Sequence, residues 1–342
     1  MKRILIIRLG AMGDVAMTVP VVSALREAYP DVRITILTTP FFQAFFRHIP
    51  DIELVPFDKK GKHKGVTGLL RLWRNIGKQY KVDAVADFHD VLRTKTVRTL
   101  FRLSGKRVAV IDKGRAEKKA LTTFIDKVMR PLESTIERYA DVLGQIGYPV
   151  SLPAAAERTV HPVPAAITER AGIKTGKWVG IAPFAQHKGK VYPVERMEAA
   201  VKGLSKNENV RLFIFGGGPK EQAVADEWAA NYPNTFSAVG KMGLSEELDL
   251  ISNLDCMVSM DSAAMHMASL YGVPVVSIWG ATHPYAGFMG WGQSVELAVQ
   301  TDHPCRPCSV FGNTPCIHGD YRCLSYISPE SIEDKVLQVI GK

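Results

Sequence analysis

Short apolar runs alternate with helical patterns twice along this chain, and that alternation limits the folds available to it. In the first half, the predicted strands cover residues 3–7, 33–37, 53–57, 84–87 and 108–111. Helical patterns lie between them, for example over 19–28 and 91–103, and a further helix is predicted over 134–146. Strands that alternate with helices predict a parallel sheet covered by helices on both faces, which is the doubly wound α/β architecture.

The second half repeats this scheme. Its predicted strands cover residues 178–181, 210–215, 256–259 and 274–278, and helices begin near Pro193, Pro219, Ser245 and Ser262. Between the halves, residues 149–164 are rich in Pro and Ala without a clear period, which is typical of an interdomain linker. A chain of 342 residues is long enough for two hydrophobic cores. We therefore predict two domains, over 1–160 and 161–342, and the last helix, from Ser328, could pack back on the first.

The composition is that of an ordinary globular protein, with 46% hydrophobic and 23% charged residues. The basic and apolar start resembles a signal peptide only faintly, because Arg8 and Asp14 interrupt the apolar region and no small-residue cleavage site follows. No stretch approaches the roughly 20 apolar residues that a spanning helix needs. We therefore expect a cytoplasmic protein that is not integral to a membrane.

The formal charge of +9 is concentrated in the first half. Two basic blocks comprise Lys59, Lys60, Lys62, Lys64, Arg71, Arg74, Lys78 and Lys81, and then Arg93, Lys95, Arg98, Arg102, Lys106, Arg107, Lys113, Arg115, Lys118 and Lys119. They are either solvated helix faces or a surface that meets anionic lipid or an anionic substrate. Leucines and a tryptophan at 69–73 lie among the first block, which suits an interfacial segment as well as a core-facing helix. Aromatic residues are not interleaved with the cations, so nucleic acid is not expected as a partner.

The chain opens with an apolar strand that stops at a glycine turn carrying one carboxylate. Residues 4–7 form the strand, residues 8–14 are predicted as a tight loop, and a helix follows from about Thr18. Doubly wound domains bind ligands at the carboxyl ends of their strands, so Asp14 is a candidate functional residue. Gly10 and Gly13 allow close approach of backbone and ligand. The spacing is not G-x-G-x-x-G and no acidic residue closes a second strand, which weakens an NAD(P)-dependent oxidoreductase interpretation.

Two loops of the second half could hold phosphate. His187, Lys188 and Lys190 follow a strand, and lysine is a compact point charge suited to phosphate, although a solvated basic loop has the same pattern. The glycines at 216–218 turn a strand into a helix with Glu221 in its first turn. Helix amides at such a turn attract anions, and a plain turn is the alternative.

A third loop of the second half is the strongest candidate site. Asp261 or Ser262 is predicted to cap a helix whose first amides point at the strand ends. The small side chains of Ala263 and Ala264 leave room for a ligand, and His266 lies one turn on, facing the side of Ser262. A lone carboxylate would repel phosphates, so Asp261 would accept sugar hydroxyls or act through a bound cation. A cap with a satisfied histidine is the structural alternative.

Four of the five cysteines crowd one loop. Cys256 lies in a predicted strand and should be buried and inert. The other four are Cys305, Cys308, Cys316 and Cys323, and the first two have the spacing of a zinc knuckle. In a cytoplasmic protein such a cluster favours structural zinc over disulfides. Reduced structural thiols and a redox or disulfide role are the alternatives.

Taken together, these motifs resemble glycosyltransferase family 9, the ADP-heptose:lipopolysaccharide heptosyltransferases. The resemblance rests on residues 8–14, 190–193, 260–266 and 272–282, and on the cysteine-rich tail that closes at 327–330. It implies a GT-B fold in which two Rossmann-like, doubly wound domains face a central cleft. The N-terminal domain would take the acceptor, and the C-terminal domain would take the nucleotide sugar.

The resemblance also implies a function. It is inverting transfer of a heptose from ADP-heptose to an acceptor sugar of the lipopolysaccharide inner core, an anionic lipid-linked glycan, with no required cofactor. The protein would then be peripheral on the inner face of the inner membrane. The alternatives are a relative that uses another nucleotide sugar for a different surface glycan, and a nucleotide-sugar-binding protein without turnover.

The resemblance also implies roles for individual residues, at the positions where this sequence matches the family's motifs. Asp14 matches the family's proposed general base, and the acceptor loop comprises Gly10, Met12 and Gly13. The positions implied for donor binding are Lys190 at the diphosphate, Glu221 at the ribose, Met242 at the nucleobase, and Asp261, Ser262, Ala263, Ala264 and His266 at the phosphate and sugar.

Overall fold

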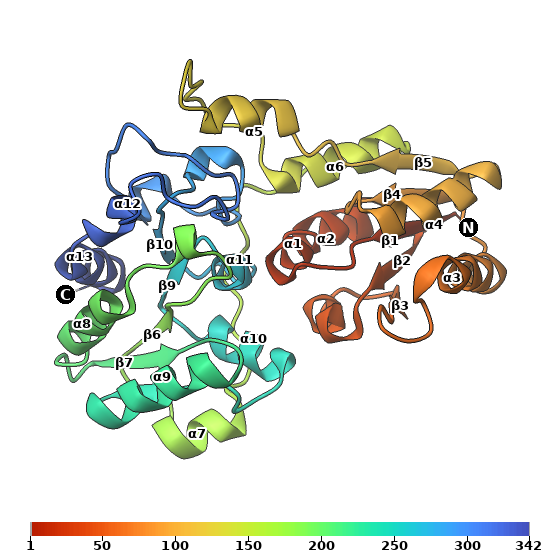
Figure 1. The fold of residues 1–342 in the computed structure, drawn as a ribbon. Coiled ribbons are helices and arrows are strands. Elements are labelled where there is room, and N and C mark those ends of the chain that lie inside the picture. The colour runs from red at the N-terminus through yellow and green to blue at the C-terminus, as the bar shows by residue number, and fades with distance from the viewer. Residues whose placement is uncertain (1, 342) are drawn as a thin grey trace. The chain divides into compact units, whose positions relative to one another are not determined.

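The computed structural model describes residues 2–341 and divides into two compact units (Figure 1). Unit 1 comprises residues 1–113 and 133–153, and unit 2 comprises residues 114–132 and 154–342. The division at residues 153 and 154 falls inside the segment expected to be a linker, earlier than the predicted boundary at residue 160. The chain thus crosses between the units three times, whereas the sequence analysis expected one crossing.

Unit 1 is built on a five-stranded sheet with the order β3-β2-β1-β4-β5, in which each pair is parallel. The strands are β1 (Arg3–Ile7), β2 (Arg33–Thr38), β3 (Ile52–Pro56), β4 (Ala84–Asp87) and β5 (Arg107–Val110). All five residues of β1 are buried, because this strand pairs on both sides and is covered on both faces.

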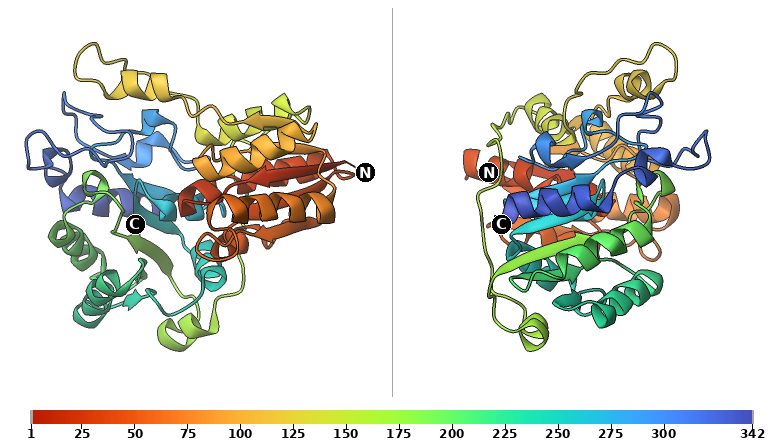
Figure 2. Two further views of the ribbon diagram at one scale, coloured as in Figure 1. Left: turned by 45° about the vertical axis from the view of Figure 1, so that its right-hand side comes forward. Right: turned by 90° about the vertical axis from the view of Figure 1, so that its left-hand side faces the viewer.

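Helices cover both faces of this sheet (Figure 2). They are α1 (Met12–Ala16), α2 (Val19–Ala28), α3 (Gly65–Tyr80), α4 (Leu92–Leu103) and α6 (Thr135–Gln145), with a 3₁₀ helix η1 (Pro40–Phe46). Helices α3 and α4 pack together, and α2 packs with α6. Leu69, Leu72 and Phe101 join Leu5 and Ile7 in one core cluster, so α3 and α4 cover the face of the sheet to which Leu5 and Ile7 point.

Unit 2 is built on a six-stranded sheet with the order β11-β10-β9-β6-β7-β8, again with parallel pairs. The strands are β6 (Lys177–Ala182), β7 (Val210–Ile214), β8 (Thr235–Ser237), β9 (Cys256–Met260), β10 (Val275–Ile278) and β11 (Ala298–Val299). The two-residue strand β11 and the three-residue strand β8 are the sheet edges.

The helices of unit 2 are α5 (Arg115–Thr122), α7 (Ala165–Ala171), α8 (Val194–Leu204), α9 (Pro219–Asn231), α10 (Leu244–Ser252), α11 (Ala263–Ser269), α12 (Arg322–Ser325) and α13 (Pro329–Ile340). Three 3₁₀ helices are η2 (Lys188–Lys190), η3 (Pro284–Ala286) and η4 (Val295–Leu297). The Ser328 side chain caps α13 as its sequence predicts, accepting a hydrogen bond from the Ser331 amide. Ile332, Val336 and Ile340 join the core of unit 2, and α13 packs on α8 and β9. The apolar face of this helix is thus buried within unit 2, and its packing back on the first domain stays a prediction.

Residues 114–132 are an insertion that belongs to unit 2 and not to the first domain. The ammonium of Lys127 donates to the carbonyls of Cys305, Arg306 and Pro307 at 2.9–3.0 Å, and to that of Pro304 at 3.4 Å. Lys118 lies over the ring of Phe288 at 4.2 Å. The Leu132 amide donates to the Tyr285 carbonyl at 2.9 Å. These partners, distant in sequence, explain why a contiguous boundary was wrong here.

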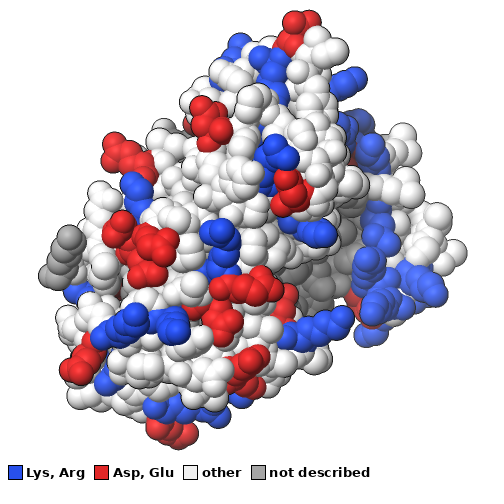
Figure 3. All heavy atoms as spheres, turned by 60° about the vertical axis from the view of Figure 1, so that its left-hand side comes forward, with Lys and Arg blue, Asp and Glu red and all other residues white. Residues whose placement is uncertain are grey.

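Charge is distributed unevenly over the surface. Figure 3 shows Lys and Arg mixed with Asp and Glu over most of one face, and gathered with few acidic neighbours along its right-hand edge. Within residues 2–341, no helix combines the length and apolar character needed to cross a bilayer.

Candidate active site

Each sheet has a topological switch point, where successive strands add on opposite sides of the first one. In unit 1 the chain builds β1, β2 and β3 in one direction and then places β4 on the other side of β1. In unit 2 it builds β6, β7 and β8, and then places β9 on the other side of β6. The carboxyl ends of the strands flanking such a point form the crevice where α/β sheets bind ligands.

Asp14 follows β1 at the switch point of unit 1, as its sequence position suggested. It does not lie in a loop, however, because Met12, Gly13 and Asp14 belong to the short helix α1. The amide of Val15 donates to the Ala11 carbonyl at 3.0 Å, which closes this turn directly after Gly10. Asp14 therefore stands in the first turn of a helix, where the helix dipole favours a negative charge.

Arg8, the first residue after β1, holds the Asp14 carboxylate. The Arg8 side chain is 7% exposed, and its guanidinium forms an ion pair with the Asp14 carboxylate, which is 33% exposed. Its second terminal nitrogen donates to the Phe88 carbonyl, directly after β4, at 2.7 Å. The guanidinium also lies 5.9 Å from the centre of the Tyr139 ring. The buried guanidinium of Arg8 is thus held by residues at the ends of β1 and β4, and it orients the Asp14 carboxylate toward solvent.

His89 and Tyr139 are the other side chains that lie near Arg8 and Asp14. The Nδ1 atom of His89 accepts a hydrogen bond from the Leu9 amide at 3.3 Å. Burial, together with the nearby charges of Arg8 and Lys113, lowers the pKa of His89 to about 3. The imidazole is therefore neutral at physiological pH. Burial raises the pKa of Tyr139, whose hydroxyl donates to the Asp14 carbonyl at 3.4 Å.

The loop after β4 is anchored by a buried ion-pair network. Asp87 is fully buried and accepts from Arg98 at 2.7 Å, and Arg98 also donates to Asp90 at 2.8 Å. The amides of His89 and Asp90 donate to the other Asp87 oxygen at 2.9 and 3.0 Å. Sequence analysis did not assign Arg8, His89 or Asp87 a role. Asp87 at the end of a predicted strand and His89 two residues later were the signal that could have found two of them.

At the switch point of unit 2, Lys190 and Asp261 form an ion pair. The ammonium of Lys190 lies 2.8 Å from an Asp261 carboxylate oxygen, with side-chain exposures of 14% and 4%. Asp261 directly follows β9, and Lys190 ends the 3₁₀ helix η2 after β6. The structure therefore brings together two residues that sequence analysis singled out in separate loops.

Lys190 is held in place through its neighbour Gly189. The Gly189 amide donates to the Gly312 carbonyl at 3.1 Å, and its own carbonyl accepts from the Ala281 amide at 2.9 Å. A Cβ atom at position 189 would lie 2.7 Å from the Gly312 oxygen and 2.9 Å from the Ala281 Cβ. Only glycine fits between these two segments, so the lysine segment is fixed to the cysteine-rich tail.

The predicted side-chain cap of α11 is not formed. Ser262 occupies the N-cap position with extended backbone, but neither it nor Asp261 makes the side-chain capping bond. Asp261 is instead engaged by Lys190, and the Ser262 hydroxyl lies 3.1 Å from that of Ser259. The amides in the first turn of α11, at Ala263 and Ala264, have no partner within the helix. His266 is buried in this helix, 6% exposed.

Glu221 and Met242 lie at the ends of the next two strands. Glu221 is in the first turn of α9 after β7, and its carboxylate accepts from the Gly217 amide at 2.7 Å. Met242 follows β8 in the turn before α10 and is partly exposed. Because the strands are parallel and ordered β9-β6-β7-β8, the candidate donor residues follow one edge in the order Asp261, Lys190, Glu221, Met242.

The cysteines are free thiols. Cys256 is buried, as predicted, and burial raises the pKa of its thiol to about 12. Burial also raises the pKa of Cys308, and that of Cys323 to about 11. Among residues 2–341, the four cysteines of the tail do not bring three metal-ligand atoms within 4.8 Å of one another. Structural zinc stays a prediction, which metal analysis of the purified protein tests.

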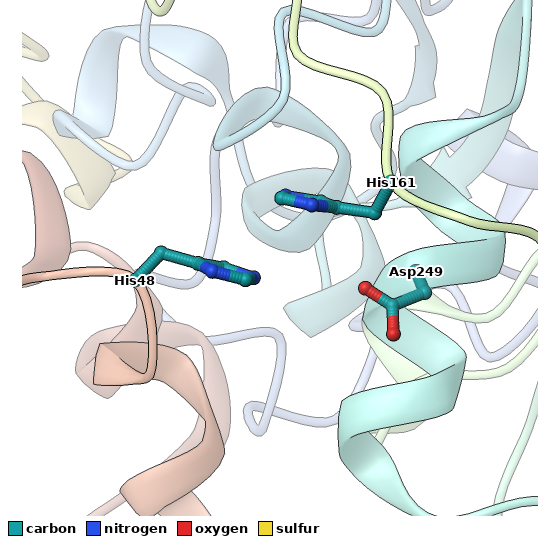
Figure 4. A group of neighbouring side chains, drawn as sticks. All are labelled: His48, His161 and Asp249. Carbon is teal, nitrogen blue, oxygen red and sulfur yellow. The ribbon is translucent and has the colours of Figure 1, made fainter.

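A histidine and a carboxylate that sequence analysis did not single out lie close together in unit 2. Figure 4 shows His161, from the segment before α7, and Asp249, from α10. Their ligand atoms lie within 4.8 Å of each other, and the His161 ring contacts Tyr271 edge-on at 5.5 Å. Two ligands are fewer than the four of a structural zinc site, so this pair supports no metal assignment. His48, also drawn there, follows η1 in unit 1.

Comparisons with known proteins identify the family. Residues 69–315, more than half of the chain, match glycosyltransferase family 9 (heptosyltransferase). The lipopolysaccharide core heptosyltransferase OpsX of Haemophilus influenzae is 26% identical over 288 residues, covering 83% of this chain and 80% of that protein. Lipopolysaccharide heptosyltransferase 3 of Escherichia coli is 24% identical over 283 residues, covering 79% and 81%.

Solved structures share the fold. A family 9 glycosyltransferase from Veillonella parvula superposes with a TM-score of 0.76 at 22% identity, over 99% of this chain and 97% of that one. ADP-heptose lps heptosyltransferase II of E. coli superposes with a TM-score of 0.69 at 16% identity, over 99% and 98%. With two parallel-sheet α/β domains, the predicted GT-B fold is confirmed. The chain belongs to glycosyltransferase family 9 and is a glycosyltransferase.

Proposed function

We propose that this protein transfers a heptose from ADP-heptose to an acceptor sugar of the lipopolysaccharide inner core, with inversion at the anomeric carbon. The relatives support this assignment, since OpsX is a lipopolysaccharide core heptosyltransferase. An E. coli heptosyltransferase of the same fold has been solved with ADP and with ADP-2-deoxy-2-fluoro heptose.

The observation that carries the proposal is the order of residues along the carboxyl edge of the second sheet. From Asp261 after β9 to Met242 after β8, the edge spans three strand spacings, roughly 14 Å. An extended nucleotide sugar presents its parts in a matching order, as sugar, diphosphate, ribose and base. In our proposal Asp261 meets the sugar, Lys190 the diphosphate, Glu221 the ribose hydroxyls and Met242 the base.

A carboxylate beside a diphosphate would repel it, and the ion pair between Lys190 and Asp261 removes this difficulty. Lys190 lies 2.8 Å from that carboxylate and offsets its charge. A bound diphosphate would share the ammonium, leaving Asp261 to accept hydrogen bonds from sugar hydroxyls. As the bond from the anomeric carbon to the diphosphate breaks, negative charge grows on the leaving oxygen. Lys190 and the first amides of α11 stabilise that charge.

Asp14 is the base in this proposal. Its carboxylate removes the proton of an acceptor hydroxyl, and that oxygen forms a bond to the anomeric carbon. The bond to the diphosphate breaks, and ADP leaves with the electron pair. Arg8 fixes the carboxylate by an ion pair, so the acid needs no reorientation during the step. The charges required are all supplied by side chains and helix amides, so we propose that no metal is needed, and turnover should persist in a chelator.

A mass-spectrometric assay with a donor panel tests this function. The purified protein receives ADP-heptose, or an ADP-, GDP- or UDP-linked hexose, with a heptose-deficient lipopolysaccharide core as acceptor. We expect a product heavier by one heptose only with ADP-heptose. Transfer from another donor would assign a different surface glycan. Tight donor binding without any product would favour a nucleotide-sugar-binding protein without turnover.

A further inference from the structure

Helix α3 exposes an apolar stripe beside the face that it packs on the core. Its buried face, with Leu69, Leu72 and Ile76, joins the core of unit 1. On another side, Val66 is 66% exposed and Leu70 is 38% exposed. Positions 66, 70, 73 and 77 follow at spacings of four, three and four, so Trp73 and Gly77 continue that stripe.

A groove continues this stripe at the carboxyl end of α3. It has a volume of about 280 Å³, and its apolar floor includes Trp73, Val82 and Phe101. Four cations line the same groove, namely Arg74, Lys78, Lys81 and Lys106. We call the stripe and this groove together the α3 face. An apolar floor bordered by cations fits a molecule with an anionic head and an apolar tail.

The α3 face carries positive charge that no acidic residue offsets locally. Between Asp58 and Asp83 the chain contains no Asp or Glu, while Lys and Arg recur through α3. Within residues 2–341, none of the four groove cations forms an ion pair with a carboxylate. Because these cations form no ion pair with a carboxylate of the described residues, they stay available to bind an external anion.

The groove lies at the edge of the sheet opposite Asp14. Val82 precedes β4 and Lys106 precedes β5, so the groove is at the amino ends of these strands. Asp14 follows β1 at the carboxyl ends. Four or five residues of parallel strand, at about 3.3 Å each, put roughly 15 Å between the two edges. The groove is therefore separate from the site where Asp14 would act on an acceptor sugar.

We propose that the α3 face docks unit 1 on an anionic phospholipid bilayer. The exposed side chains of the stripe would enter the boundary between headgroups and acyl chains, while the groove cations hold lipid phosphates. A nucleic acid fits less well, because stacking platforms need several exposed aromatic rings and the stripe offers Trp73 alone. The inference concerns binding to lipid and does not depend on the transferase reaction.

A second exposed apolar segment is a weaker candidate for this contact. Phe124 is 54% exposed and Ile125 is 77% exposed in the insertion of unit 2. Residues 114–132 carry two acids, Glu117 and Asp126, among five cations. Two of those cations are engaged inside unit 2, since Lys118 lies over the ring of Phe288 and Lys127 donates to carbonyls of the cysteine-rich tail. Charge complementarity therefore favours the α3 face.

Vesicle flotation of the full chain tests the proposal. Vesicles of phosphatidylcholine are compared with vesicles containing equal parts of phosphatidylcholine and phosphatidylglycerol. We expect binding only to the anionic vesicles, weakening as salt is raised. The variant Arg74→Glu/Lys78→Glu/Lys81→Glu should lower the partition coefficient on the order of 100-fold, because each basic residue near an anionic bilayer contributes about 1 kcal/mol.

Matched control variants distinguish binding by the α3 face from an effect of net charge and from binding by the segment that contains Phe124 and Ile125. Arg170→Glu/Lys202→Glu/Lys206→Glu changes three exposed cations of unit 2 and lowers the net charge equally. It should keep most of the binding, as should Phe124→Ser/Ile125→Ser. Brominated anionic lipid should quench part of the tryptophan fluorescence of the wild type, and that part should be missing in Trp73→Phe.

Three results would overturn the proposal. The first is binding by the α3 triple variant that equals the wild type. The second is an equal loss in the unit 2 triple variant, which would indicate net charge alone, or a loss confined to Phe124→Ser/Ile125→Ser. The third is displacement of the protein from vesicles by a DNA duplex at equal anion concentration, which would assign the face to a polyanion. Circular dichroism of each variant excludes unfolding as a cause.

Discussion

At the scale of single residues, each unit pairs one acid with one cation at its switch point. In unit 1 the pair is Asp14 with the buried Arg8, and in unit 2 it is Asp261 with Lys190. Removing one member of a buried pair leaves the other charge without compensation, which costs far more than the pair itself contributes. In the proposed mechanism, these two pairs supply the charges that act on the acceptor and on the donor.

Lys190 offers the most direct residue-level prediction. Lys190→Gln should weaken binding of ADP about 10- to 100-fold, because a hydrogen bond to a charged group contributes about 1.5–3 kcal/mol. The uncompensated Asp261 would then also repel the diphosphate. Isothermal titration calorimetry measures the dissociation constant. Lys202→Gln, at an exposed position of α8, is the control and should bind ADP like the wild type. Equal affinity in Lys190→Gln would remove Lys190 from the phosphate site.

The sequence could predict the positions of the candidate residues but not their partners. Asp14, Lys190 and Asp261 were found because each follows a recognisable buried strand. The partnership of Arg8 with Phe88, and of Leu9 with His89, joins residues 80 positions apart. It exists only because β4 pairs with β1, and strand order is a tertiary property that no local pattern contains.

At the scale of elements, the central strands were predicted most accurately. β1 and β4 have the predicted bounds, because fully buried strands are uninterrupted apolar runs. The edge strands β8 and β11 were missed, since three and two residues are too few for a period. Helix α1 was missed because Gly13 lies inside its single turn, and glycine normally indicates a break.

The insertion at 114–132 supplies a prediction about an element. Its docking depends on the ring of carbonyls that Lys127 holds, so Lys127→Met should lower the free energy of unfolding of unit 2 by about 1–3 kcal/mol. Chemical denaturation followed by tryptophan fluorescence measures the change. Lys119→Met, at an exposed position of α5, should be neutral. A neutral Lys127→Met would mean that water replaces the ammonium at no cost.

At the scale of the whole molecule, burial of neutral histidines in both units makes stability depend on pH. The pKa of His89 is lowered to about 3 and that of His283 to about 4, mainly by burial. Unfolded chains bind these protons below about pH 6.5, so this stability is present above that pH and is lost as the pH falls toward 4. Glu247, whose pKa burial raises to about 7, acts in the opposite direction.

Variants isolate the histidine contribution. The wild type should lose stability between about pH 7 and pH 5, and His89→Gln should lose less, by about 1–2 kcal/mol at the lower pH. Urea denaturation at both pH values measures the difference. His318→Gln, at an exposed position, should follow the wild type. An unchanged pH dependence in His89→Gln would show that His89 binds its proton in the folded protein.

The division into units illustrates what sequence could not predict at this scale. Two doubly wound sheets follow from alternation that is visible in each half. The assignment of 114–132 to unit 2 follows from contacts to residues 285–288 and 304–307, which are more than 150 positions away. A domain boundary is a property of contacts, and local composition indicated only the crossing at 149–164.

The central claim is that unit 1 supplies the base and unit 2 holds the donor. Its most direct test is Asp14→Asn, assayed in parallel for ADP-heptose binding and for heptose transfer to the lipopolysaccharide core. The account predicts unchanged donor affinity with turnover reduced about 100-fold or more, since only proton removal is lost. Turnover near that of the wild type, or a loss of donor affinity that accounts for the whole defect, would contradict it.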